Sequence, residues 1–164
     1  MSRLKKRYDV TTNEKFLKEK SRVVTELNSE VRTVTELLLE HMKAYPEKQG
    51  VSAVQLGYLV RAHALRINNE VTVMYNLEFV HKFLFQFSNE GCSSLKDRYG
   101  LWRPLFGKIK YLDKDLKEQT MWLGKKQVRI AAHEIDHANG VLLNSKGRRW
   151  RFDTKTSGHY LPKA

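Results

Sequence analysis

Residues 125–140 read KKQVRIAAHEIDHANG, and this stretch decides how the rest of the sequence is interpreted. Its apolar residues recur at spacings of three and four, which is typical of a helix with one buried face. Gly140 favours a helix end, because glycine readily adopts the left-handed conformation that closes a helix. The sequence therefore predicts a helix from about Lys125 to Asn139. Its apolar positions are Val128, Ala131, Ala132, Ile135 and Ala138.

Two histidines, His133 and His137, lie four residues apart in this stretch. Positions i and i+4 share one face of a helix, so both imidazoles can reach a single metal ion. Glu134 lies beside that face, where its carboxylate can take a proton from a metal-bound water. The alternative is a solvated polar stretch of helix. The neighbouring residues are small or apolar, however, which indicates a buried segment in which histidines need partners.

A catalytic metal site needs a third protein ligand and one open position. After the helix the sequence contains no Glu and a single His, His159, which lies in the tail. Cys92 is the better candidate. It lies in the stretch EGCSS at residues 90–94, just after a predicted strand, where Gly91 permits close approach of the backbone. A thiolate with two imidazoles forms a site suited to Fe(II), Zn(II), Co(II) or Ni(II).

A third stretch, GVSAVQ at residues 50–55, also has the composition of a ligand-binding segment. Its small residues let the chain pass close to a ligand, and the side-chain amide of Gln55 can donate to a developing oxyanion. Taken alone, such a stretch is usually only a turn.

The rest of the sequence predicts strands. Residues 58–67 and 71–79 are expected to form a hairpin, with its turn at Asn68-Asn69. Further strands are expected around Phe83, Phe85 and Phe87, at residues 108–113 and at residues 119–123.

An amphipathic helix is expected at residues 29–45, where Asn28 or Ser29 can cap the start and Pro46 lies just past the end. No internal repeat or linker is present, so residues 1–164 are expected to form a single catalytic domain. The predicted fold class is α+β. Mostly antiparallel β-sheets would pack around the central metal-binding helix, with the N-terminal helix on the outside.

The composition excludes some settings. No stretch approaches the roughly 20 apolar residues that cross a bilayer, and no apolar signal-peptide core follows the basic N-terminus, so neither membrane insertion nor export is expected. The chain contains a single cysteine, which rules out an intramolecular disulfide and favours the reducing cytoplasm.

The net charge of +12 suggests a polyanionic partner such as nucleic acid, although many soluble proteins are simply basic. The C-terminal tail, residues 141–164, is basic and weakly patterned. Its stretch KGRRWR at residues 146–151 interleaves basic and aromatic side chains and could contact ribosomal RNA. The alternative is a solvated basic tail.

Taken together, the three stretches and their order resemble the peptide deformylase family. That family carries a Gly-rich segment ending in Gln, then Glu-Gly-Cys, then a His-Glu-x-x-His helix. The resemblance covers roughly residues 16–145, with further similarity at Asn76-Leu77 and from Arg103 to Tyr111. It implies a hydrolase that removes the formyl group from the N-terminal formyl-methionine of nascent polypeptides and releases formate.

The resemblance also implies roles for individual residues. A divalent ion, usually Fe(II), would be held by Cys92, His133 and His137. Glu134 would transfer the proton from water to the departing amine. The oxyanion would be held by the metal, by the side-chain amide of Gln55 and by the backbone N–H of Ser93. Glu90 and Arg103 would form a pair that steadies the cysteine loop. The expected substrate-binding residues are Gln49, Gly50, Val51, Gly91, Arg129 and Ile130.

The sequence departs from the family pattern at several positions. Lys48 replaces the first Gly of the opening motif, Ser52-Ala53-Val54 replaces Ala-Ala-Pro, and Ser93 replaces an apolar residue. On the helix before His133, Ile130 suits an apolar methionine pocket. Arg129 and Lys126 do not, unless their stems snorkel and their charges reach water.

Two other functions are compatible with the pattern. One is a related metallopeptidase, which would cleave unformylated peptides internally. The other is a basic nucleic-acid-binding protein with a structural metal, although a structural zinc normally has four protein ligands and only three are apparent here. The protein is expected to act as a monomer on N-formylmethionyl peptides, with a possible contact to the ribosome through its basic surface or tail.

Overall fold

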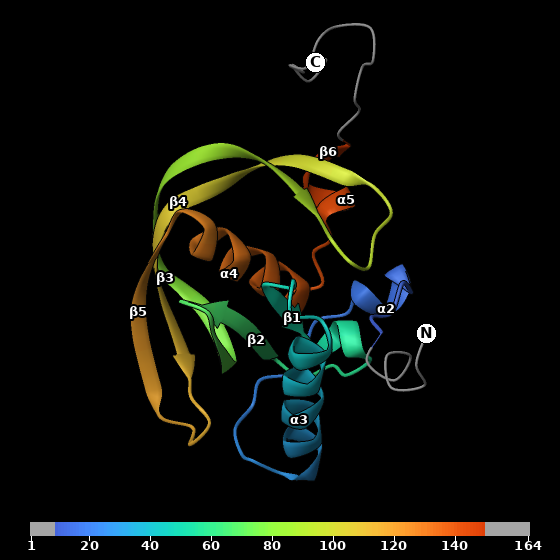
Figure 1. The fold of residues 1–164 in the computed structure, drawn as a ribbon, viewed down its shortest axis with the longest axis vertical. Coiled ribbons are helices and arrows are strands. Elements are labelled where there is room, and N and C mark those ends of the chain that lie inside the picture. Colours follow the sequence, from blue (N-terminus) through green and yellow to red (C-terminus); the bar gives the residue numbers. More distant parts are fainter. Residues whose placement is uncertain (1–8, 150–164) are drawn as a thin grey trace, which may run out of the picture.

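The computed structural model describes residues 9–149, and helix α4, Lys125–Ala138, lies inside a curved sheet (Figure 1). The helix starts directly after a strand, with Gly124 as its N-cap, and ends at Asn139, followed by Gly140 with φ +70°. Buried Val128 and Ala131 face the sheet. The helix predicted at residues 125–139 is therefore confirmed. The sheet residues in the same core cluster are Leu65, Met74, Leu77, Ile109, Tyr111 and Leu123.

Within residues 9–149 the sheet has six antiparallel strands. Five follow one another in the order β1-β2-β3-β4-β5, and β6 pairs with β4. The predicted hairpin turn is confirmed, because Asn68 and Asn69 have φ of 49° and 70° between β2 and β3. The strands are β1 (Gly50–Ser52), β2 (Ala62–Ile67), β3 (Glu70–Gly91), β4 (Arg98–Leu112), β5 (Glu118–Gly124) and β6 (Arg148–Arg149).

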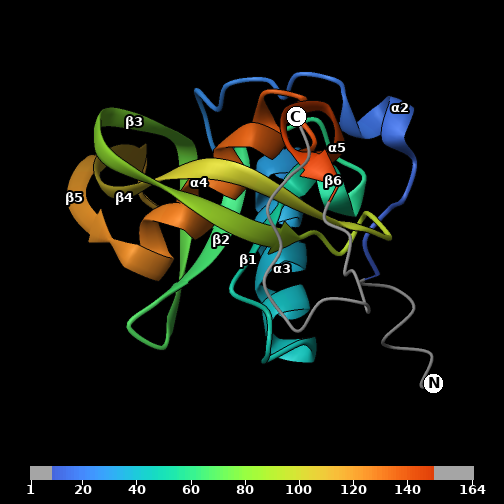
Figure 2. The ribbon, with the colours of Figure 1, turned by 90° about the horizontal axis from the view of Figure 1, so that it is seen from above.

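The long strand β3 joins two elements that the sequence predicts as separate. Register shifts between Tyr75 and Glu78 and between Phe79 and His81 break the ladder with β4 without ending it. Irregularities of this kind bend a strand. The strands β3 and β4 together form an arch over α4 (Figures 1 and 2). The strand predicted around the alternating phenylalanines is confirmed. The rings of these phenylalanines are exposed: Phe83, Phe85 and Phe87.

Two strand boundaries were predicted wrongly. β4 begins at Arg98, ten residues before the predicted start at 108, because its early part pairs with the end of β3. β2 begins at Ala62 rather than at residue 58. The backbone of residues 58–61 is used elsewhere: the N–H of Tyr58 donates to Ala53, and Leu59 accepts from Arg22. Periodicity alone does not reveal such competing partners.

Helix α3, Ser29–Ala44, packs outside the sheet, against β1 and β2 (Figure 2). Asn28 caps it by accepting from the N–H of Val31 at 3.0 Å, so the predicted helix and its cap are confirmed. A short helix α2 (Glu14–Leu17) precedes it, and the 3₁₀ helix η1 (Ala53–Leu56) follows β1. The buried apolar face of α3 consists of Val31, Val34, Leu38 and Met42.

The first part of the C-terminal tail is structured. Residues 143–146 form helix α5 (Leu143–Lys146), and Arg148 and Arg149 pair as β6 with Gly100 and Tyr99 of β4. The weak pattern of the tail therefore did not reveal these two elements within residues 141–149. Residues 150–164, which include His159 and the end of the predicted RNA-contacting stretch, lie outside the described residues.

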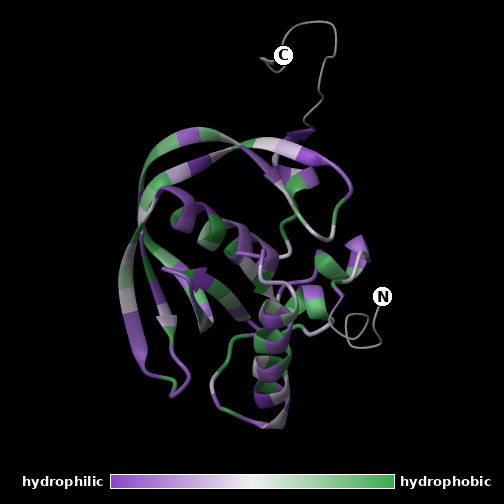
Figure 3. Cartoon of the chain, viewed as in Figure 1, coloured by the Kyte–Doolittle hydropathy of each residue, from purple (hydrophilic) through white to green (hydrophobic). Residues whose placement is uncertain are grey.

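The two long helices each have a polar face and an apolar face. Figure 3 shows polar and apolar residues alternating along α3 and α4, as expected for helices with one buried face. Within residues 9–149, no helix is long and apolar enough to cross a membrane.

Gly140 leaves no room for a side chain. It has φ +70°, and a Cβ built there would lie 2.2 Å from the carbonyl oxygen of Lys18. We expect Gly140→Ala to lower the free energy of unfolding by more than about 2 kcal/mol in urea titrations. The cost of the strained backbone conformation and the cost of the clash with the Lys18 carbonyl are summed in this variant.

Gly57 provides the matched control. It has φ +91°, but no atom lies within 4 Å of a Cβ built there. Gly57→Ala should therefore cost only about 1 kcal/mol, from backbone strain alone. Equal losses in the two variants would show that the close approach to Lys18 is not a constraint.

Candidate metal centre and active-site cleft

Three potential metal ligands meet where α4 passes the end of β3. Helical spacing places His133 and His137 on one face, with ring centroids 4.8 Å apart. Cys92 follows the last residue of β3, and its Sγ lies 3.3 Å from Nε2 of His137. One ligand atom from each of the three residues lies within 4.8 Å of the others. The structure therefore brings together the residues that the sequence singled out as ligands.

The chemistry of these residues suits a divalent cation. Burial, together with the nearby His133, holds the pKa of His137 well below its usual range, so this imidazole is neutral, as a ligand must be. His137 Nδ1 is buried and has no hydrogen-bond partner within the described residues. His133 is oriented by a contact of 3.2 Å between its Nδ1 and Glu90, the arrangement usual for a metal-binding histidine.

The environment of His133 favours a positive charge among these donors. Burial disfavours its protonated form, but hydrogen bonds to Cys92 and Glu90 outweigh this and raise its pKa to about 10. A proton is thus strongly held where sulfur and nitrogen donors converge. A divalent ion would replace that proton, and the Cys-His-His donor set fits such an ion.

Glu134 is buried beside the cluster with its carboxylate held from two sides. Its Oε2 accepts from the hydroxyl of Ser52 at 2.7 Å. On the other side, a Cβ at Gly50 would lie 2.7 Å from Oε1, so only glycine lets the chain pass this close. Burial raises the pKa of Glu134, although His133 and the Ser52 hydroxyl oppose the shift. The carboxyl group is therefore fixed in place and can hold a proton.

A buried histidine is connected to this carboxylate through the hydroxyl of Ser52. His63 of β2 is fully buried, and its Nδ1 lies 2.8 Å from the hydroxyl of Ser52. Burial, with a smaller effect of Arg61, lowers the pKa of His63 to about 3, so the ring is neutral. It can donate its Nδ1–H to Ser52, whose hydroxyl then donates to Glu134. His63 is not among the site residues predicted from the sequence, although a histidine within an otherwise apolar strand was the signal for it.

The pair predicted between Glu90 and Arg103 is present and is nearly completely buried. Two hydrogen bonds of 2.9 Å join the guanidinium to the carboxylate, and a third of 2.5 Å joins it to Asp136. Burial disfavours the charged Glu90, yet hydrogen bonds from His133 and Arg103 lower its pKa to about 2. Lys146 of α5 also binds Asp136 at 2.9 Å. The helix, the arch and the tail are thus joined through one charge network.

The two residues predicted to hold the oxyanion differ in exposure. Gln55 is buried, with its Nε2 3.7 Å from Cys92 Sγ and 3.3 Å from Ser94, so its amide NH₂ is turned toward the cluster. Ser93 is exposed, and its hydroxyl accepts from Lys48 at 2.7 Å. Two departures from the family pattern, Lys48 and Ser93, therefore contact each other.

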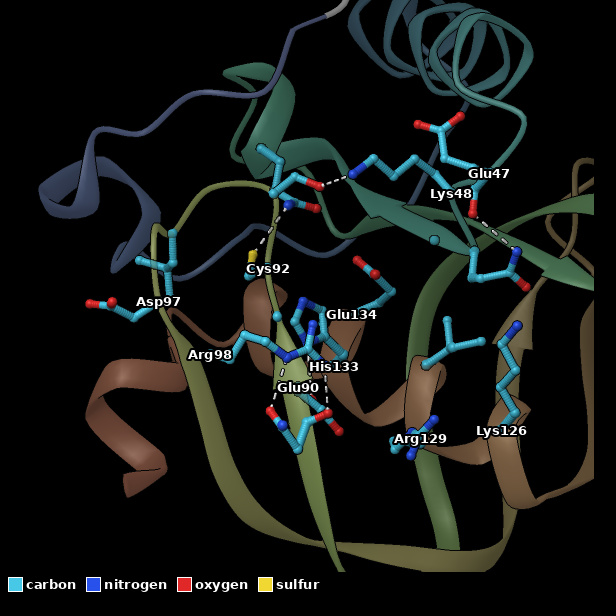
Figure 4. Close-up of a pocket in the computed structure, with 18 of the residues that line it drawn as sticks. Glu47, Lys48, Glu90, Cys92, Asp97, Arg98, Lys126, Arg129, His133 and Glu134 are labelled. Carbon is cyan, nitrogen blue, oxygen red and sulfur yellow. Dashed lines mark hydrogen bonds and ion pairs between the residues drawn. The ribbon is translucent and has the colours of Figure 1, made fainter. Parts of the chain in front are cut away.

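A cleft of about 690 Å³ opens beside the cluster, and Figure 4 shows Cys92, His133 and Glu134 facing it. The side chain of Val51 is buried in the core with α3 and does not line this cleft, so any contribution to substrate binding would come from its backbone. The other residues predicted to bind substrate line the cleft: Gln49, Gly50, Gly91, Arg129 and Ile130.

The fold and this site define the class of protein. A His-Glu-x-x-His helix with a cysteine as third potential ligand, beside a cleft, is the site of a metal-dependent hydrolase. The sequence model of the polypeptide deformylase family matches residues 9–151. The chain belongs to the polypeptide deformylase family, whose members are hydrolases that remove formyl groups.

Individual relatives agree with this assignment. The peptide deformylase of Thermoanaerobacter pseudethanolicus is 33% identical over 145 residues, which is 88% of this chain and 91% of that protein. The peptide deformylase of Rickettsia prowazekii is 34% identical over 146 residues, 82% of this chain and 83% of that protein. The predicted family and the predicted α+β class are confirmed, and neither the metallopeptidase nor the nucleic-acid-binding alternative is favoured.

A solved structure shows the same fold. The Synechococcus elongatus peptide deformylase, crystallised with actinonin, has a TM-score of 0.76 and 22% identity, covering 85% of this chain and 78% of that chain. At this identity the likeness concerns the fold alone.

Removing the buried guanidinium should be costly. We expect Arg103→Gln to lower the free energy of unfolding by about 3–5 kcal/mol, because the buried carboxylate of Glu90 loses its guanidinium partner and Asp136 keeps only Lys146. Urea titration monitored by circular dichroism measures the loss. Lys110→Gln, at the exposed ion pair with Glu78, should change stability little. Comparable losses in the two variants would contradict the role of the buried network.

Proposed function

We propose that this chain removes the formyl group from the N-terminal formyl-methionine of peptides, with Cys92, His133 and His137 holding the metal ion. One observation carries the proposal. These three donors converge within 4.8 Å of one another, and the carboxylate of the adjacent Glu134 is buried and fixed beside them. Three protein ligands leave a coordination position open for chemistry, whereas a structural site would be closed by four.

The metal ion would act as a Lewis acid and lower the pKa of water. We propose Fe(II) as the native ion, with Zn(II), Ni(II) or Co(II) able to replace it, because a mixed thiolate and imidazole donor set accepts all four. The neutral state of His137 and the Glu90 contact of His133 support their role as nitrogen ligands.

Glu134 is the proposed general base and acid. Its carboxylate would take a proton from the attacking water and deliver it to the amine that departs from the formyl carbon. Formate and a free N-terminus would then leave. The raised pKa of Glu134 supports this role, because a carboxyl group with a raised pKa can hold the proton between the two transfers.

Hydrogen bonds from Gln55 and Ser93 would stabilise the oxyanion. The carboxamide of Gln55 is preorganised, because its Oε1 accepts from the backbone N–H of Ser52 at 3.0 Å, which turns the NH₂ group toward Cys92. The backbone N–H of Ser93 would provide the second donor, so its exposed side chain is free to differ from that of the family. Donors fixed in advance stabilise developing charge without reorganisation.

The peptide substrate would bind by adding a strand to the sheet. β1 is the first strand in the sheet order and pairs only with β2 within residues 9–149, so its other edge can accept a peptide. Gly50 is the first residue of β1 and Gln49 precedes it, and both line the cleft together with Gly91 at the end of β3. Main-chain pairing would let the enzyme accept many nascent sequences.

The setting that we propose is the cytoplasm, where a thiolate ligand stays reduced, with the protein acting as a monomer. The net charge of +12 supports a contact with ribosomal RNA. Part of the basic tail is engaged within the protein instead, since Lys146 binds Asp136 and Arg149 binds Asp97. An RNA contact would therefore rest mainly on other basic residues.

Replacing Glu134 should separate catalysis from metal binding. We expect Glu134→Ala to reduce formate release from formyl-Met-Ala-Ser by about 10²–10⁴-fold, because the proton carrier is lost, while one metal ion per chain remains bound. Elemental analysis beside a formate assay measures both. Cys92→Ala should lose metal and activity together. Full activity of Glu134→Ala would show that the proposed proton transfer is wrong.

The metal assignment predicts different lifetimes in air. The ferrous form should lose formate-releasing activity under aerobic conditions, because ferrous iron and a coordinating thiolate are both open to oxidation. The nickel and cobalt forms should stay active longer in a parallel time course with matched metal content. Equal aerobic stability of all metal forms would argue against a ferrous native state.

A further inference from the structure

The active-site cleft is lined by cations on several walls. They come from the segment before β1, from the connection between β3 and β4 with the start of β4, and from the first two turns of α4. In the view of Figure 4, Lys48 lies on one side of Glu134, and Lys126 and Arg129 lie on the other. The five cations are Lys48, Lys96, Arg98, Lys126 and Arg129.

None of these five cations forms an ion pair within residues 9–149. Three of them donate to neutral oxygen atoms, which orient the side chain but do not neutralise its charge. These hydrogen bonds are Lys48 to Ser93 at 2.7 Å, Arg98 to the side chain of Asn89 at 3.0 Å and Arg129 to Ser88 at 3.1 Å.

The acidic residues of the cleft are mostly committed to other partners. Glu90 is bound by Arg103, and Asp97 is bound by Arg149 at 2.8 Å. Glu134 is buried and is hydrogen-bonded by the hydroxyl of Ser52 at 2.7 Å. Among the described lining residues, Glu47 is the one acidic residue left to balance the five cations, so the cleft carries an excess of positive charge. A charged, partly enclosed cleft focuses its field on the ligand and raises the local concentration of ligands of opposite sign.

We propose that the cleft selects formylated peptides that carry acidic side chains in the residues directly after the formylated one. This inference rests on the proposed deformylase function and concerns which nascent chains are favoured. An extended peptide presents alternate side chains to opposite walls, and cations lie on more than one wall. Acidic side chains at successive positions would therefore each meet a cation that lacks a counter-charge.

Arg129 is the main specificity residue in this proposal. It lies four residues before His133 on α4 and so occupies the same helical face, one turn from the metal cluster. Its side chain is half-buried, and a charge interaction is stronger there than in open solvent. Its fork of N–H donors, of which one binds Ser88, can bind a carboxylate with two hydrogen bonds.

A pair of peptides of equal shape tests the proposal. We expect kcat/KM for formyl-Met-Asp-Glu to exceed that for formyl-Met-Asn-Gln about ten-fold in low salt, and the ratio to fall toward one in 1 M NaCl, where the Debye length is about 3 Å. Arg129→Gln should reduce the ratio several-fold, and Arg98→Gln should reduce it as well. Lys114→Gln removes the same charge from an exposed turn outside the cleft and should leave the ratio unchanged.

Equal kcat/KM for the two peptides in low salt, or a ratio unaffected by both cleft variants, would overturn the proposal. Peptide binding to the Glu134→Ala variant, measured by calorimetry, separates this result from failure of the proposed function. If neither peptide releases formate from the native enzyme, the deformylase proposal fails. The ratio of the two dissociation constants still decides whether the cleft prefers acidic peptides.

Discussion

The buried ion pair between Arg103 and Glu90 is the interaction on which the site depends. Arg103 lies on β4 and Glu90 on β3, two residues before Cys92, so the pair fixes the cysteine relative to the arch. The same guanidinium reaches Asp136 on α4, and Glu90 contacts His133. One cation therefore orients, through Glu90, the imidazole of the proposed ligand His133, and it couples the helix to both long strands.

This network explains how a polar helix face can lie inside the sheet. Buried charges are costly unless they are paired and hydrogen-bonded. The two acidic residues of α4 are accommodated differently, since Asp136 is paired with Arg103 and Lys146, whereas Glu134 is hydrogen-bonded by the hydroxyl of Ser52. The first part of the tail thus contributes to the site, because Lys146 belongs to α5.

The residues proposed for catalysis and those proposed for substrate choice occupy different places. The cluster of Cys92, His133 and His137 lies beside the cleft, next to the buried carboxylates of Glu90 and Glu134. The five cations line the cleft, and three of them, Lys48, Arg98 and Arg129, contact neutral oxygen atoms rather than the carboxylate of Glu134. Under the proposed function, changes in these charges would alter which peptides bind and would leave the reaction at the formyl carbon the same.

The central helix and the position of His133 and His137 on one face of it could be predicted from the sequence, because helical spacing is a local property. Cys92 could be predicted as the third ligand because few other candidates were present. Tertiary structure decided what supports them. The hydroxyl of Ser52 meets His63 and Glu134 only through strand pairing and helix packing, and Lys48 meets Ser93 across the cleft. Register shifts made β3 one continuous bent strand, and tail residues found partners on β4 and α4. Such contacts join residues far apart in the chain, and hydrophobic periodicity describes only which face of its own element a residue occupies.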